Sequence, residues 1–257
     1  MVRESRSREE EPVDPDFTVR AMLPMAVATS IDALAVGVTF AFLRVDIGPA
    51  VGFIGLTTLL LSAMDEGRLS PEDRVLELLP PERPGPVTRK RLERVTVFQL
   101  MTHTSGIVPW YPFYADGRAF YTVLEHVLSS TPVEPGMAYS DLNFMLLGLI
   151  FTQVTGLSLR EGLEHYIKGP LGISDLSYGP VDPGLCAPSC YGNQIEQRMC
   201  AERGISFQGW RPNGVPVRGS CNDGNAYYYW RGASGHAGVF ATSAALVRLC
   251  QFYMTTQ

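Results

Sequence analysis

Lysine is almost absent from this sequence, which has only Lys90 and Lys168 among its 257 residues. Neither lysine stands three residues after a serine. The sequence therefore contains no Ser-x-x-Lys, in which a lysine one helical turn along acts as the base for a serine nucleophile. A serine hydroxyl without a base is a poor nucleophile at neutral pH. The scarcity of lysine thus excludes this way of activating a serine within the given residues.

Positive charge is also scarce. Lysine and arginine total 21 residues against 26 acidic residues, a formal net charge of −5. This balance gives no reason to expect nucleic acid or an anionic membrane surface as a partner. Charged residues make up 18% of the chain and apolar residues 46%, which is enough apolar material for a buried core and argues against general disorder. The length allows one large domain or two small ones.

Cysteines are few and unevenly placed. The sequence has five, and four of them, Cys186, Cys190, Cys200 and Cys221, fall within 36 residues; the fifth is Cys250. Their spacing fits no common zinc pattern, and His236 is the one histidine near them. We interpret them as ordinary thiols, with a metal site or a disulfide as the alternative.

The first 63 residues differ from the rest of the chain. Residues 1–16 form a charged, proline-containing arm whose six acidic residues are unlike a signal peptide. Residues 17–63 are mostly apolar and predict a transmembrane-like helical segment. Its clearest part is 21–43, where Asp32 is the single charge in 23 residues. That length suffices to cross a hydrocarbon core of about 30 Å, so we expect the membrane as a partner through residues 21–43.

A second apolar stretch covers residues 47–64 and is rich in glycine, isoleucine and leucine. Small residues recur in it, as they do in packed membrane helices. Two interpretations are open. The stretch forms a second, weaker membrane span, or it packs into the body that follows.

From Asp65 onward the composition is that of a folded domain. Thr96 is placed to cap a helix that starts near residue 95, and Gly67 suits the end of a helix. Other elements follow from apolar spacing and from glycine and proline signals. These are helices over Asp141–Gly156, Leu159–Ile167 and Ser243–Met254, a stop at Gly169-Pro170, a strand over Gly238–Thr242, and long loops with short strands over 180–222.

Several short runs in a fixed order carry a family resemblance. They are Met64-Asp65-Glu66-Gly67-Arg68-Leu69-Ser70, Leu100-Met101-Thr102-His103-Thr104-Ser105-Gly106, Pro135-Gly136-Met137-Ala138-Tyr139-Ser140-Asp141, Gly169-Pro170-Leu171-Gly172-Ile173, Asn222-Asp223-Gly224-Asn225-Ala226-Tyr227 and Ser234-Gly235-His236-Ala237-Gly238-Val239-Phe240. Over residues 63–257 this order resembles the β-lactamase-related serine hydrolases, which include class C β-lactamases, penicillin-binding-protein-like carboxypeptidases and related esterases. The penicillin-binding protein 4B-like branch is the most similar in character. The resemblance implies an α+β fold with helices on an antiparallel sheet, incomplete here because its first and last strands are missing.

The resemblance also implies site residues. The family's second motif, Tyr-x-Asn, matches Tyr139-Ser140-Asp141, which makes Tyr139 a proton relay and puts Asp141 where an asparagine is usual. An aspartate there changes the hydrogen bonding to a substrate amide. The alternative is that this run only opens a helix, with Ser140 or Asp141 as its cap. His103, in the run at 100–106, is expected to fix a loop by a hydrogen bond.

The other two motifs of the family are missing. Its Ser-x-x-Lys would lie about seventeen residues before Gly67, near Ala50 and Phe53, and neither Ser30 nor Ser62 replaces it. The third motif, Lys-Thr-Gly or His-Thr-Gly, is absent before the sequence ends. The run around His236 resembles a separate, upstream signature, so His236 is either a structural turn residue or an oxyanion or catalytic group. Whether the chain is an enzyme is therefore left open.

The apolar head has a resemblance of its own. Ala26-Val27-Ala28-Thr29-Ser30-Ile31-Asp32-Ala33-Leu34-Ala35-Val36-Gly37-Val38 is similar to one membrane helix of the manganese efflux pump family, and the similarity extends over about residues 14–62. It implies that Asp32 is a membrane-embedded carboxylate for Mn²⁺, an ion that hard oxygen ligands suit. No other cofactor is expected. One or two spans cannot enclose a dehydrated ion, so transport by this chain alone is not expected.

The sequence thus predicts a charged arm (1–16), a transmembrane-like segment (17–63) and a truncated β-lactamase-related domain (64–257). The domain is expected to be membrane-associated and catalytically incompetent as given, and the side of the membrane on which it lies stays open. Its ligand would be a peptidoglycan-like peptide or a small ester or amide, with no nucleic acid. The alternatives are a fragment of a manganese efflux transporter and a non-catalytic, membrane-tethered peptidoglycan-binding module.

Overall fold

The computed structural model describes residues 47–255, which belong to a compact unit of residues 45–257. Three sequence predictions lie outside the described residues: the charged arm 1–16, the span 21–43 and the metal ligand Asp32.

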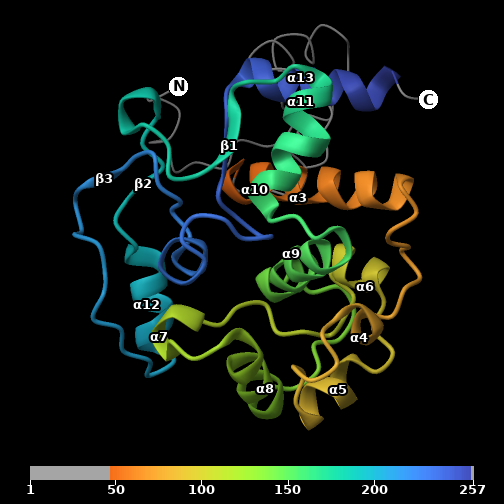
Figure 1. Cartoon of the computed structure of the whole chain (residues 1–257). Coiled ribbons are helices and arrows are strands. Elements are labelled where there is room, and N and C mark those ends of the chain that lie inside the picture. The colour runs from red at the N-terminus through yellow and green to blue at the C-terminus, as the bar shows by residue number, and fades with distance from the viewer. Residues whose placement is uncertain (1–46, 256–257) are drawn as a thin grey trace, which may run out of the picture. The chain divides into compact units, whose positions relative to one another are not determined.

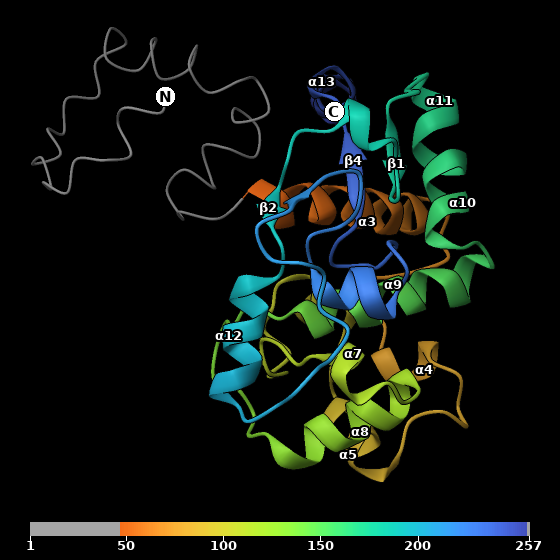
Figure 2. The same ribbon diagram turned by 90° about the vertical axis from the view of Figure 1, so that its left-hand side faces the viewer.

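Helix α3 (Ile47–Asp65) lies inside this unit rather than apart from it. Leu56, Leu59, Leu60 and Ala63 recur at the spacing of one helix face, and each is fully buried. The helix packs on α9 and on strand β4, as Figures 1 and 2 show. Of the two interpretations of residues 47–64, the structure supports packing into the body, through the buried face of residues 56–63. The boundary predicted at residues 63/64 falls inside α3.

Membrane-type helices are not evident in the described part of the chain. Between residues 47 and 255, no single helix has the length and apolarity to cross a bilayer. One pair of helices, Asp141–Thr155 with Leu159–Leu171, together has the length and apolarity of a membrane span, but the chain bends by 76° between them. The first helix lies in the core of the unit, which accounts for its apolar composition.

Helix α9 (Asp141–Thr155) is the central helix of the unit and confirms the predicted helix over Asp141–Gly156. Most of its side chains are buried, which is why its sequence is apolar on nearly every face. It ends at Gly156, whose φ of 74° is a left-handed conformation that favours glycine. Its other end, near Asp141, positions the candidate site described below.

Five short helices lie on one side of α9. They are α4 (Val75–Leu78), α5 (Pro86–Leu92), α6 (Val97–Met101), α7 (Phe113–Asp116) and α8 (Phe120–Ser130). The predicted cap of α6 is confirmed, because the Thr96 hydroxyl accepts from the Gln99 N–H and the Gln99 side chain accepts from the Thr96 N–H. The helix that the sequence predicts around His126 is confirmed as α8. It buries Val123, Leu124 and Val127 and packs on α5 (Figure 1).

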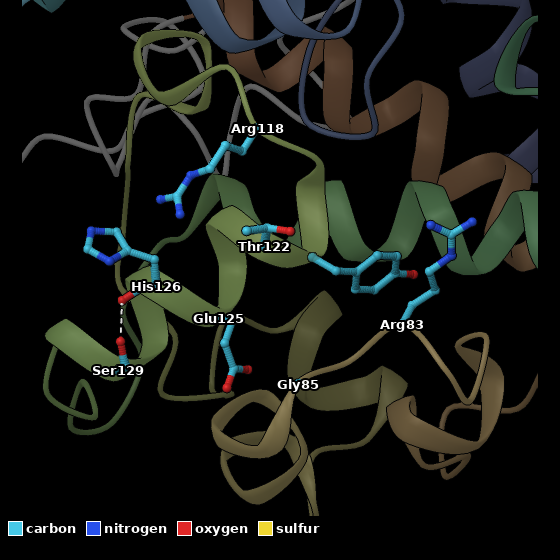
Figure 3. A pocket seen from close by; sticks show the side chains of 8 residues that line it. Arg83, Gly85, Arg118, Thr122, Glu125, His126 and Ser129 are labelled. Carbon is cyan, nitrogen blue, oxygen red and sulfur yellow. Dashed lines mark hydrogen bonds between the residues drawn. The ribbon is translucent and has the colours of Figure 1, made fainter.

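Glu125 of α8 caps the beginning of α5 from across the gap between the two helices (Figure 3). Its carboxylate accepts hydrogen bonds from the Val87 N–H at 2.8 Å, the Thr88 N–H at 2.8 Å and the Thr88 hydroxyl at 2.6 Å. The residue before α5, Gly85, has no side chain that could do so. Burial opposes ionisation of Glu125, but these hydrogen bonds outweigh it and hold its pKa below the usual value.

Glu125→Gln is expected to lower the free energy of unfolding by about 1–2 kcal/mol at pH 7, the usual loss for a charged cap. Because the folded pKa is lowered, the ionised carboxylate stabilises the fold above its unfolded pKa, and this contribution is lost as the pH falls through the folded pKa. The difference between variant and parent should therefore shrink below about pH 4. Urea unfolding at a series of pH values measures it, with the exposed Glu77→Gln on α4 as the control. An equal difference at all pH values would contradict the assignment.

The strands form two antiparallel pairs. Strand β1 (Leu176–Tyr178) pairs with β4 (Val239–Ala241), and β2 (Cys190–Tyr191) pairs with β3 (Pro216–Val217). In the first pair Ser177 lies opposite Phe240. The expected antiparallel pairing and the strand near residues 238–242 are confirmed, although within residues 47–255 each sheet has only two strands.

The remaining elements correct the sequence prediction in two places. The chain does not stop being helical at Gly169-Pro170: α10 (Leu159–Leu163) continues as η3 (Glu164–Lys168) and α11 (Gly169–Leu171). Pro170 stands in the first turn of α11, where a missing N–H costs little. The region expected to be loops also contains a helix, α12 (Gln194–Glu202). Short turns η4 (Pro183–Leu185) and η5 (Asn225–Tyr229) and the confirmed C-terminal helix α13 (Ser243–Thr255) complete the unit.

Candidate functional site

Tyr139 and Asp141 meet at the beginning of α9. The Tyr139 hydroxyl donates to Asp141 Oδ1 over 3.0 Å, and 44% of Tyr139 is exposed. Burial, followed by the negative charge of Asp141, raises the pKa of Tyr139, so the phenol keeps its proton at neutral pH. The structure therefore brings together the two residues predicted from the second motif. It places a phenol where a ligand can reach it.

The loop before α9 is held by His103. The Ser140 N–H donates to His103 Nδ1 over 3.0 Å, and the Ser140 hydroxyl donates to the Val108 carbonyl over 2.8 Å. Burial lowers the pKa of His103, which favours the neutral ring needed to accept this bond. The His103 ring also lies 4.8 Å from that of Tyr139, centroid to centroid. The loop-fixing role predicted for His103 is confirmed. Ser140 stands at the N-cap position of α9, as the alternative expected, but its side chain makes no capping hydrogen bond.

His236 and Asp223 form a largely buried ion pair beside this loop. His236 Nε2 lies 2.8 Å from Asp223 Oδ1, and only 2% of His236 is exposed. The other ring nitrogen, Nδ1, lies 2.7 Å from the Ser234 hydroxyl. Asp223 Oδ1 also accepts from the Ala226 N–H over 2.7 Å. His236 thus fixes the turn before β4 to the segment that leads into η5. This agrees with the first of its two predicted roles, that of a structural turn residue.

Each member of this pair stabilises the charged form of the other. Burial opposes ionisation of Asp223, but the positive charge of His236 and the hydrogen bond between them hold the Asp223 pKa below its usual value. Burial likewise opposes protonation of His236, and the negative charges of Asp223, Asp141 and Glu196 overcome it and raise the His236 pKa. A protonated imidazole cannot act as a base, so in this state His236 is unsuited to activate a serine.

The second motif and the ion pair converge in space. Asp141, Asp223 and His236 each place one donor atom within 4.8 Å of the others. Burial, and less strongly the charge of Asp223, raise the pKa of Asp141 to about 6, against the opposing effects of His236 and of the hydrogen bond from Tyr139. Asp141 is therefore ionised at pH 7 and protonated in mildly acidic solution.

Glu196 of α12 is a member of this site that the sequence did not suggest. Its carboxylate accepts from the Gly224 N–H over 2.6 Å and from the Tyr114 hydroxyl over 2.7 Å. Burial, and then the charges of Asp223 and Asp141, raises the pKa of Glu196 to about 7. No signal in the sequence marks it, because its partners lie 28 and 82 residues away and the helix that carries it was not predicted.

An activated serine is not found in the described site. Lys168 pairs with Glu164 within η3, and Lys90 lies on α5. Ala50 and Phe53, near which Ser-x-x-Lys was expected, belong to α3. The serines around the site are all engaged: Ser105 donates to Asn143, Ser140 to Val108, and Ser234 bonds to His236.

Two other features lie apart from this site. A hollow of about 430 Å³ over α8 is lined by side chains of Arg83, Arg118 and His126, but its carboxylate, Glu125, is occupied by α5 (Figure 3).

The cysteines do not form the alternative metal site: the donor cluster found in the described part of the chain contains none, and Cys186, Cys190, Cys200 and Cys221 are free thiols.

Comparison with known proteins gives two family matches. The profile of the family described as "Beta-lactamase" matches residues 56–256, and that of the family described as "Putative manganese efflux pump" matches residues 1–66. A curated relative, "Putative D-alanyl-D-alanine carboxypeptidase" of Escherichia coli (strain K12), is 31% identical over 204 residues, which cover 75% of this chain. The chain spans only 46% of the length of that relative.

Solved structures agree on the fold. "Beta-Lactamase/D-Alanine Carboxypeptidase from Pseudomonas syringae" superposes with a TM-score of 0.55 at 20% identity, over 83% of this chain and 51% of that one. A D-stereospecific amidohydrolase from Streptomyces sp. gives a TM-score of 0.52 at 20% identity, over 78% of this chain and 58% of that one. These likenesses support the predicted β-lactamase-like fold. They extend over little more than half of each solved structure.

Proposed function

Because the chain belongs to the β-lactamase family, we propose that its body binds peptides of the D-alanyl type, or related small amides and esters, without forming an acyl-enzyme. The observation that carries this proposal is the Tyr139–Asp141 pair at the start of α9, with Tyr139 exposed, in a sequence without Ser-x-x-Lys. The ligand class comes from the relative named as a putative D-alanyl-D-alanine carboxypeptidase and from the solved structure named as a D-alanine carboxypeptidase.

The chemistry of the pair suits a polar peptide ligand. The Tyr139 phenol donates a hydrogen bond, and ionised Asp141 only accepts them. An asparagine in the place of Asp141 would present a donor as well. The site is therefore suited to peptide N–H groups or ammonium groups of a ligand, and less suited to a ligand that presents a carboxylate to Asp141.

The chemistry also explains why binding is not followed by acylation. Acylation needs a hydroxyl whose proton passes to a nearby base. The serines near Tyr139 are engaged in structural bonds, and the imidazole of His236 is held in an ion pair with Asp223. The body is accordingly a hydrolase-derived binding module.

Binding and turnover are tested separately on the purified full chain. A fluorescent penicillin should leave no covalent label, and a peptide ending in D-alanyl-D-alanine should release no D-alanine. Calorimetric titration with the same peptide should saturate, and Tyr139→Phe should weaken binding about fivefold through the loss of one hydrogen bond. Tyr191→Phe, an exposed tyrosine of β2, is the matched control and should bind normally.

Either half of the proposal can fail on its own. Covalent labelling of any serine would overturn the absence of acyl-enzyme chemistry. A folded chain that shows no saturable binding, or that binds the L-alanyl-L-alanine peptide equally well, would overturn the ligand class.

We propose further that the N-terminal segment attaches this body to a membrane. The match of residues 1–66 to an efflux pump family supports attachment through residues 21–43 and a manganese-binding role for Asp32. The match covers about a quarter of the chain, so attachment is the better supported role and transport the alternative. Sedimentation of the full chain with membranes after an alkaline wash tests attachment; recovery in the supernatant would contradict it.

A further inference from the structure

Three potential metal ligands converge from distant parts of the chain. Asp141 begins α9, Asp223 precedes η5, and His236 lies in the turn before β4. One donor atom from each lies within 4.8 Å of the other two. Ligands around a bound zinc ion stand at about 2.0–2.2 Å from the metal, so their donor atoms are roughly 3 Å apart. Small side-chain rotations would close this set around one ion.

We propose that Asp141, Asp223 and His236 bind one divalent first-row metal ion, of the Zn²⁺ or Mn²⁺ class. One imidazole nitrogen with two carboxylate oxygens suits these ions, whereas Mg²⁺ and Ca²⁺ prefer sites made of oxygen alone. The proposal concerns the ion only and does not depend on the binding of a peptide.

The charge balance of the site favours a cation. Asp141 and Asp223 flank a single imidazole, and the charge of Glu196 also acts on it. None of the described hydrogen bonds or ion pairs joins these three carboxyls to lysine or arginine. The carboxylates of Asp141 and Asp223 lie within 4.8 Å of each other and repel one another. A divalent ion at the centre would neutralise two of the charges and relieve that repulsion.

The groups around the ligands hold them in suitable directions. Ser234 bonds to Nδ1 of His236 over 2.7 Å, which leaves Nε2 facing the carboxylates. Tyr139 donates to Asp141, and the Ala226 N–H donates to Asp223. Outer hydrogen bonds of this kind orient the ligands of protein metal sites. On binding, the Nε2 proton now shared with Asp223 leaves to solvent and the nitrogen lone pair forms the bond to the metal.

The test uses the full chain after dialysis against EDTA. Titration with Co²⁺, a spectroscopic probe for this ion class, should show one site per chain, with d–d absorption but no thiolate-to-metal charge-transfer band. Zn²⁺ should displace the probe, and Mg²⁺ in equal amount should not. Asp141→Asn should weaken Co²⁺ binding by more than about 100-fold, beyond the roughly 10–100-fold usual for the loss of an outer hydrogen bond. His236→Gln should weaken it at least as much. His126→Gln, an exposed histidine of α8, is the control and should bind like the parent.

A second readout keeps the test independent of folding. Asp141→Asn retains an oxygen that can accept from Tyr139 and removes one charge from a crowded site. The metal-free variant should therefore melt at or above the temperature of the metal-free parent, while the rise in melting temperature on adding Zn²⁺ should be smaller than in the parent. Unchanged Co²⁺ affinity in folded Asp141→Asn, or a charge-transfer band that reports cysteine ligands, would overturn the proposal. Loss of peptide binding with an intact metal site would bear only on the proposed function.

Discussion

Asp223→Ala is expected to lower the free energy of unfolding of the metal-free chain by about 3–5 kcal/mol at pH 7, the usual cost of breaking a buried ion pair from one side. The change leaves the His236 imidazole, 2% exposed, without its counter-charge. It also leaves the Ala226 N–H without the oxygen that it donates to over 2.7 Å. Urea unfolding in the presence of EDTA measures the loss.

Two further variants show whether the pair itself is responsible. Asp175→Ala removes an exposed carboxylate that precedes β1 and should change the stability by no more than about 0.5 kcal/mol. Asp223→Ala combined with His236→Phe should be more stable than Asp223→Ala alone, because it removes the buried unpaired imidazole. Equal losses for Asp223→Ala and Asp175→Ala would show that the ion pair is not formed in solution.

Gly235→Ala is expected to lower the free energy of unfolding by about 3 kcal/mol or more, at the upper end of the usual cost of overpacking. A Cβ at this position would overlap the carbonyl oxygen of Phe144 in α9 and lie 2.9 Å from Cδ2 of Leu56 in α3. The first of these atoms belongs to the backbone of a buried helix and cannot move aside. For a domain of this size the change corresponds to a fall of roughly 6–12 °C in melting temperature.

Gly117→Ala is the matched control for this prediction. Gly117 has a φ of 71°, and a methyl group added there would meet no atom within 4 Å, so its substitution costs only the left-handed backbone, about 1–2 kcal/mol. Calorimetry of both variants separates the two effects. If Gly235→Ala melted no lower than Gly117→Ala, the close approach between the turn at 234–238 and α9 would be wrong.

Local features of the fold were predictable from the sequence. The cap at Thr96 and the end of α9 at Gly156 depend on a few neighbouring residues, whose hydrogen bonds and backbone angles are set within one turn of the chain. The strand at 239–241 likewise appeared where its sequence placed it. The Tyr139–Asp141 pair is also a local feature, because the two residues are two positions apart and the start of α9 fixes the directions of both side chains.

Features that depend on distant partners were not predictable. The apolar composition of residues 47–64 is equally suitable for a membrane and for a protein core, and only the packing of α3 on α9 and β4 decided between them. Helix α12 was missed, since its sequence lacks strong start and stop signals and its formation depends on contacts with distant neighbours.

The sequence by itself determined the family to which the body belongs, the position of its second motif and the absence of a serine–lysine pair, because these properties are read along the chain. Only the tertiary structure decided that Asp141, Asp223, His236 and Glu196 share one site. Their charges interact through space over a few ångströms, and such short distances between residues far apart in the sequence are fixed by packing and not by spacing along the chain.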